Sequence, residues 1–148
     1  MTELEKYIYS YGKYIGCGVA RRAYLLHGQV YKIPQGSYGM RQAVREKELY
    51  ESLPNKFKPL FPSPQFLSQG VIICSRVKLI DEMISCWTDT PLEEIEEYSL
   101  ASQSSIKLFK ELLSFFNKHN LDTEDLLYNG GNLGVIRNEI KIIDWGAS

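Results

Sequence analysis

The sequence predicts an α+β protein whose first half is rich in strands and whose second half is helical. Short runs of Tyr, Ile and Val, separated by glycine turns, fill most of residues 7–33. Apolar residues at three- and four-residue steps define one helix over residues 102–118. A length of 148 residues is enough for a single domain with its own core. We therefore expect one domain, in which the strand-rich part ends near residues 77–82.

The composition is that of a soluble globular protein. Hydrophobic residues make up 44% and charged residues 24% of the chain, which excludes a disordered or fibrous protein. The net charge of −1 does not favour a nucleic-acid or membrane-surface binder. The three cysteines form no disulfide framework or metal-ligand pattern, and no signal peptide or membrane span is visible. We expect a cytoplasmic protein with free thiols.

The first half predicts three strands and a helix. The strands are expected near residues 12–16, 21–26 and 29–33, joined by glycine turns. Good helix formers then fill residues 40–53, where apolar side chains recur at helical intervals. Pro54 is expected to end this helix.

The second half begins with a proline-rich connector over residues 59–64. Two β-rich runs, 65–68 and 70–79, follow and predict a hairpin. The helix over 102–118 is expected to bury one apolar stripe, made by Ile106, Phe109, Leu112, Leu113 and Phe116. Two further strands are expected around a turn at Arg137 and Asn138.

A glycine turn and a lysine form the first group of residues that could carry chemistry. Gly16 and Gly18 would let backbone N–H groups approach phosphate oxygens, and Lys32 on a following strand would supply a positive charge. Glu46 or Glu48 on the 40–53 helix could hold that lysine in place. Because the two glutamates are two helical residues apart, they cannot both face the sheet.

The second group lies near the C-terminus. Asp144 follows the largely apolar run Ile140-Lys-Ile-Ile, which is typical of a buried strand, and precedes Trp145-Gly146. A carboxylate in this position suits Mg²⁺ beside phosphates, and the amide of Asn132 could supply another oxygen ligand. Asp144 could also be a simple turn residue at a strand end.

In this order, the segments resemble the eukaryotic-like protein kinase superfamily, especially the small kinase-like proteins of bacteriophages and bacteria. The likeness covers residues 12–146. It implies a minimal two-lobed kinase fold with a β-rich N-lobe at about 1–78 and a reduced helical C-lobe at about 79–148. It also implies ATP and Mg²⁺ as cofactors.

The resemblance assigns roles to individual residues. Lys32 would position ATP, and Glu46 rather than Glu48 would pair with it. The backbone of the segment that links the two lobes would contact adenine. Other residues would form the phosphate loop, bind Mg²⁺ or accept the hydroxyl proton. In chain order, these further assignments fall on Gly16, Gly18 and Arg21 for phosphate, Arg76 and Val77 for adenine, Asp125 for the proton, and Asn132 and Asp144 for the metal.

The chain departs from the kinase pattern in three places. Leu127 stands where the family has its catalytic aspartate, five residues before Asn132, so either Asp125 acts from a longer loop or the base is lost. Arg21 replaces the third glycine of the phosphate loop, where it would touch phosphate or close the site. Two residues follow Gly146, so we expect the usual substrate-binding remainder of a kinase to be absent.

Two main hypotheses for the function follow. In the first, the protein binds ATP and transfers a phosphoryl group to a hydroxyl of a protein or of itself. In the second, it is a pseudokinase-like module that binds and inhibits a partner protein. A small-molecule phosphotransferase and a purely structural protein are further alternatives. We expect no nucleic-acid or membrane partner, and a location in the cytoplasm, or in the host cytoplasm if the protein is viral.

Overall fold

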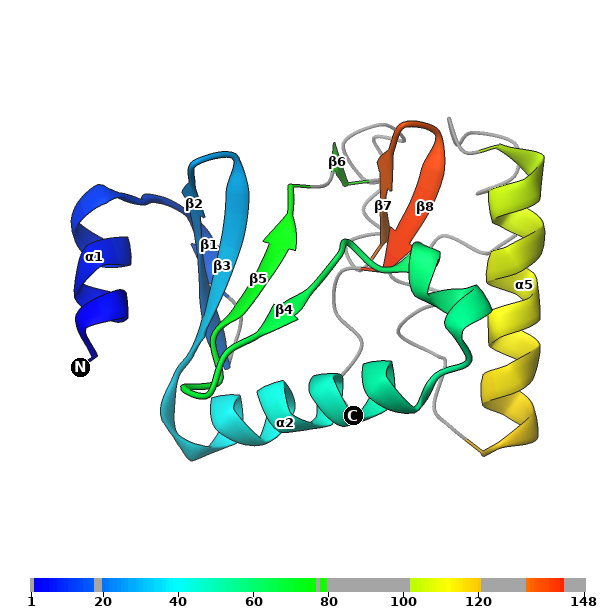
Figure 1. Cartoon of the computed structure of the whole chain (residues 1–148), viewed down its shortest axis with the longest axis horizontal. Coiled ribbons are helices and arrows are strands. Elements are labelled where there is room, and N and C mark those ends of the chain that lie inside the picture. The colour runs from blue at the N-terminus through cyan, green and yellow to red at the C-terminus, as the bar shows by residue number, and fades with distance from the viewer. Residues whose placement is uncertain (1, 18–19, 77, 80–101, 121–132, 143–148) are drawn as a thin grey trace. The chain divides into compact units, whose positions relative to one another are not determined.

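The computed structural model describes residues 2–17, 20–76, 78–79, 102–120 and 133–142 (Figure 1). The protein is α+β, as the sequence predicts. It divides into two compact units, each with its own antiparallel sheet. The first unit comprises Met1–Ser52 and Ser63–Arg76, and the second comprises Leu53–Pro62 and Val77–Ser148.

The first unit contains a sheet of five strands in the order β1-β2-β3-β5-β4. The strands expected near 12–16, 21–26 and 29–33 are present, each within one residue of its predicted bounds. The 65–79 hairpin is also present but shorter than expected. The strands of this unit are β1 (Lys13–Cys17), β2 (Arg21–Leu26), β3 (Gln29–Pro34), β4 (Gln65–Phe66) and β5 (Ile72–Ser75).

Helix α1 (Glu3–Tyr11) precedes the sheet and is not among the elements expected from the sequence. Residues 7–11, which we had included in a strand-rich region, are helical. The helix begins with a capping box, in which the Thr2 hydroxyl accepts from the Glu5 N–H at 3.1 Å. This Thr-x-x-Glu signal is present in the sequence. Ile8 of α1 is fully buried and packs with Tyr24 in an apolar cluster on the sheet.

The two faces of the first sheet are different because successive side chains of a strand point to opposite faces. One face carries the apolar cluster that α1 covers. The other face carries a smaller cluster with α2, where Ala43 packs with Ile72 and Cys74. The larger cluster is formed by Ile8, Tyr24, Leu26, Ile33, Val71 and Ile73.

Helix α2 (Gly36–Ser52) begins four residues before the predicted start and ends before Pro54, as expected. The earlier start follows the turn at Gly36, which has a positive φ of 63°. The buried side of α2 carries no large apolar side chain of its own. Its buried residues are small or polar, namely Gly39, Gln42, Ala43 and Glu46.

The second unit combines a three-stranded sheet, in the order β6-β7-β8, with helix α5 (Gln103–Lys118). The predicted apolar stripe of this helix is confirmed, since all five of its residues are buried. The turn between β7 and β8 is confirmed as well, with positive φ at Arg137 and Asn138. The other elements are the 3₁₀ helix η1 (Asn55–Leu60) and the strands β6 (Lys78–Leu79), β7 (Leu133–Ile136) and β8 (Glu139–Ile142).

Two expectations are corrected in this unit. The first two residues of the connector expected over 59–64 belong to the 3₁₀ helix η1, in which Phe57 and Leu60 are buried. The run expected to form one strand over 70–79 is divided. Its last two residues, Lys78 and Leu79, pair with β7 in the second sheet instead of continuing β5.

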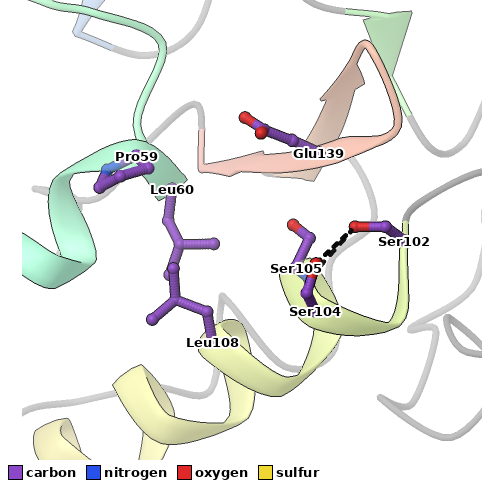
Figure 2. A pocket seen from close by; sticks show the side chains of 7 residues that line it. All are labelled: Pro59, Leu60, Ser102, Ser104, Ser105, Leu108 and Glu139. Carbon is purple, nitrogen blue, oxygen red and sulfur yellow. Dashed lines mark hydrogen bonds between the residues drawn. The ribbon is translucent and has the colours of Figure 1, made fainter.

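The start of α5 is joined to β8 by a side-chain hydrogen bond. The Ser105 hydroxyl accepts from the Ile140 N–H at 2.7 Å, and both residues are buried. Ser105 also lines a hollow of about 170 Å³, together with residues that include Leu60 of η1 and Glu139 of β8. Figure 2 shows how these side chains lie. The hydrogen bond fixes the first turn of α5 against the second sheet.

Candidate functional site

Arg21, Lys32 and Glu46 form a buried ionic group in the first unit, referred to below as the ionic triad. Glu46 has no exposed surface, and each of the two cations is 7% exposed. Lys32 Nζ donates to Glu46 Oε2 at 3.3 Å, so the contact expected between these two residues is present. Glu48 is exposed, which leaves Glu46 as the glutamate that faces the sheet.

Arg21 makes the closer contact with the same carboxylate. Its Nη1 donates to Glu46 Oε2 at 2.7 Å, and its Nη2 donates to Oε1 at 2.5 Å. Two parallel N–H···O bonds of this kind are short, strong and geometrically specific. The sequence predicts Arg21 in the phosphate loop and does not predict this pairing with Glu46.

Strand register explains why the two cations meet one carboxylate. Lys32 of β3 lies opposite Ala23 of β2, whereas Arg21 lies opposite Pro34, two positions further along β3. Arg21 and Lys32 are therefore diagonal neighbours on one face of the sheet. The small side chain of Ala23 leaves room between them for Glu46, which α2 supplies from above this face.

Because the ionic triad is buried, the free energy of unfolding depends strongly on its hydrogen bonds. An isolated carboxylate in an apolar interior is very costly, and its cost is offset only by close partners with good hydrogen bonds. Glu46 has three such bonds from the two cations. Removing one partner of a buried ion pair typically destabilises a protein by about 3–5 kcal/mol. The ionic triad thus fixes α2 to two neighbouring strands.

Small residues lie beside Lys32 across the sheet. Gly16 of β1 is opposite Ala23, which is opposite Lys32, and Lys32 is opposite Ile72 of β5. A Cβ atom added to Gly16 would meet no atom within 4 Å. At the two positions in line with Lys32 on β1 and β2, Gly16 and Ala23, the sheet thus carries no side chain larger than a methyl group.

Cys74 of β5, for which the sequence predicts only a free thiol, is a titratable neighbour of the ionic triad. It is buried, forms no disulfide and packs with Ala43 and Ile72. Burial raises the pKa of the Cys74 thiol. The negative charge of Glu46 raises this pKa further, whereas Lys32 and Arg21 lower it. Cys74 is therefore a neutral thiol at neutral pH.

The structure describes only one of the remaining site residues expected from the sequence. Arg76 is exposed and is the last residue of the first unit. The other expected site residues lie outside the described part of the chain. They are Gly18, Val77, Asp125, Asn132 and Asp144. In the part that is described, no three His, Cys, Asp or Glu side chains are grouped so that they could hold a metal ion.

Comparisons with known proteins add no assignment. No protein family model, curated protein or solved structure matches this chain. Among the helices of the described ranges, none has both the length and the apolar character needed to cross a membrane. The ionic triad and the strands around it are thus the basis for the proposal that follows.

Proposed function

We propose that the protein binds ATP in a kinase-like site and uses Mg²⁺ to transfer the γ-phosphoryl group to a hydroxyl, on a protein or on itself. One observation carries this proposal, namely the buried contact between Lys32 of β3 and Glu46 of α2. A lysine on the third strand, paired with a glutamate on the following helix, is the pair that protein kinases use to position ATP phosphates.

The chemistry of the ionic triad supports a phosphate ligand. The Lys32 ammonium is a compact positive charge, and Glu46 holds it on the face of the sheet that also carries the small residues Gly16 and Ala23. Phosphate oxygens are the anionic acceptors that such a cation binds. Lys32 would hold the α- and β-phosphates, and Glu46 would orient Lys32.

The other roles rest on the sequence resemblance alone. Asn132 and Asp144 would hold Mg²⁺, which supplies positive charge that neutralises the phosphates. Asp125 would accept the proton of the acceptor hydroxyl. The backbone of Gly16 and Gly18 would contact phosphate. Arg76 and Val77 would offer backbone groups to adenine.

A pseudokinase-like module that binds a partner protein is the second candidate. The observation in its favour is Leu127, which occupies the position of the family's catalytic aspartate. In this case the fold is retained, with or without nucleotide binding, and phosphoryl transfer is absent. The two candidates make opposite predictions for turnover.

The test of nucleotide binding compares the wild type with Lys32→Ala. Mg·ATP at about 100 times its Kd should raise the free energy of unfolding of the wild type by about 2.7 kcal/mol, measured as a thermal shift. Lys32→Ala should lose at least about tenfold in affinity by calorimetry, because it removes the phosphate-binding charge. It should still fold, since Arg21 continues to pair with Glu46.

Lys47→Ala is the matched control, because Lys47 is an exposed lysine on the same helix as Glu46. This variant should bind Mg·ATP like the wild type. The ATP-binding proposal fails if the wild type shows no shift at millimolar ATP. The role of Lys32 fails if Lys32→Ala binds Mg·ATP as tightly as the wild type does.

A further inference from the structure

We propose that Arg21 is a positioning residue that holds Glu46 in the orientation in which its carboxylate meets Lys32. The inference rests on the proposed function in one respect, because Lys32 is the residue that would bind ATP. It assigns Arg21 an action through Glu46, in place of direct contact with phosphate. Three observations on the ionic triad carry it.

The first observation is the difference between the two contacts of Glu46. Arg21 reaches both carboxylate oxygens, at 2.5 and 2.7 Å, whereas Lys32 reaches only Oε2, at 3.3 Å. The terminal torsion of a glutamate side chain has a broad energy profile, so its rotamer does not fix the plane of the carboxylate. A guanidinium that bonds to both oxygens fixes that plane, and a single ammonium contact does not.

The second observation concerns the chain segment that contains Arg21. The preceding residue, Ala20, lies against Gly39 of α2, and its carbonyl accepts from the Gln35 N–H at 2.7 Å. Gly39 and Glu46 are seven residues apart, which is about 10 Å along a helix and close to two full turns. Ala20 and Arg21 thus contact α2 at two points on one stripe, and together they fix the helix in position and rotation.

The third observation is the small apolar contact between α2 and the sheet. Among the fully buried residues of α2, Ala43 is the only apolar side chain, and it packs with Ile72 and Cys74. The half-buried Tyr50 adds one ring contact with Phe66 of β4, with the centroids 5.7 Å apart. The stabilisation from apolar burial is non-directional and scales with the buried area. A cluster this small therefore specifies the rotation of α2 only weakly. Directional bonds from Arg21 to Glu46 supply that specification.

The ligand-independent test is hydrogen exchange of the Lys32 ammonium, followed by NMR on the ¹⁵N-labelled full chain. Arg21→Gln should speed this exchange by about tenfold, because the carboxylate that Lys32 contacts is no longer held, and a tenfold change corresponds to about 1.4 kcal/mol. Glu46→Gln should speed it by at least as much. Adding Arg21→Gln to Glu46→Gln should produce no further increase, as expected for residues that act through one another.

The same variants are then titrated with Mg·ATP. Arg21→Gln should weaken binding by about tenfold, and Arg21→Lys should recover part of the loss, because a lysine can hold only one carboxylate oxygen. The double variant should bind no more weakly than Glu46→Gln alone. Arg22→Gln is the matched control, since Arg22 is the next residue of β2, is exposed and points to the opposite face of the sheet.

Each other outcome overturns the inference. Slower exchange of the Lys32 ammonium in Arg21→Gln would show that Arg21 competes with Lys32 for Glu46. Unchanged exchange would show that Arg21 has no effect on Lys32. If the losses in ATP affinity multiply in the double variant, Arg21 contacts the ligand independently. Should Arg21→Gln fail to fold, Arg21→Lys replaces it, and exchange as slow as in the wild type then refutes positioning.

Failure of the proposed function would look different. If the exchange pattern is as expected and the wild type does not bind Mg·ATP, Arg21 positions Lys32 and the ligand assignment is wrong. If the wild type binds Mg·ATP and Arg21→Gln binds it equally well with unchanged exchange, the ligand assignment stands and the role of Arg21 is refuted.

Discussion

Gly39, near the start of α2, lies directly against the carbonyl oxygen of Ala20. A Cβ atom on Gly39 would overlap that oxygen and would lie 3.1 Å from the Cα atom of Pro34. Both neighbours are backbone atoms, which cannot rotate away as a flexible side chain does. Glycine at this position lets α2 approach the sheet closely enough for Glu46 to reach Arg21 and Lys32.

Gly39→Ala should therefore destabilise the first unit although alanine is the better helix former. Overpacking typically costs about 1–3 kcal/mol, whereas alanine gains about 1 kcal/mol over glycine inside a helix. We expect a net loss in the free energy of unfolding, measured with urea, and weaker binding of Mg·ATP. Lys47→Ala, at an exposed position of α2, is the control for helix propensity. A Gly39→Ala protein as stable as the wild type would contradict this account of the close approach.

Ser105→Ala tests the connection between α5 and β8. It leaves the buried Ile140 N–H without the hydroxyl that accepts from it at 2.7 Å. Leaving a buried donor unsatisfied typically costs about 1–3 kcal/mol, which urea unfolding would detect. Ser104→Ala is the matched control, because the Ser104 hydroxyl is exposed and lies 3.2 Å from that of Ser102. Equal stability of the two variants would show that the Ser105 bond contributes nothing.

Cys74 predicts a specific dependence of stability on pH. Its pKa in the folded protein is raised above the ordinary thiol value of 9.0, mainly by burial. The stability that the neutral thiol contributes is therefore complete below the ordinary thiol value, which applies to the unfolded chain. It is lost as the pH rises from there through the raised pKa of the folded protein. The stability of the wild type relative to Cys74→Ala should therefore fall as the pH rises above about 9. A constant difference over this range would show that burial does not perturb the thiol.

Asp125→Asn decides between the enzyme and the binding module. If Asp125 accepts the hydroxyl proton, the variant should lose phosphoryl transfer, including autophosphorylation, by about 10²-fold or more with nearly unchanged ATP affinity. Transfer from labelled ATP is the measurement, and Asp122→Asn is the control in the same segment. Transfer in neither the wild type nor the variant, with ATP bound by both, would favour the pseudokinase-like module.

Much of the local structure could be predicted because its signals repeat along the chain. The stripe from Ile106 to Phe116 recurs at helical spacing, so α5 and its buried face follow from the sequence within one residue. The turn at Arg137 and Asn138 is equally local. Helix α1 was also predictable from its Thr2–Glu5 capping box, but a β-rich composition obscured it. These elements depend on residues a few positions apart.

The sequence also indicated that Lys32 has a glutamate partner on the next helix, but it could not by itself show the position of Arg21. That position depends on the register of β2 and β3, which makes Arg21 the diagonal neighbour of Lys32. It also depends on Gly39, which lets α2 pack closely against the face of the sheet that carries both cations. The departure of Lys78 and Leu79 into the second sheet likewise depends on pairing with β7, more than fifty residues away. Sequence periodicity therefore determined the elements and their buried faces. Only the tertiary structure decided which charges share one carboxylate, because register and helix docking join residues that are distant in the chain and leave no local pattern.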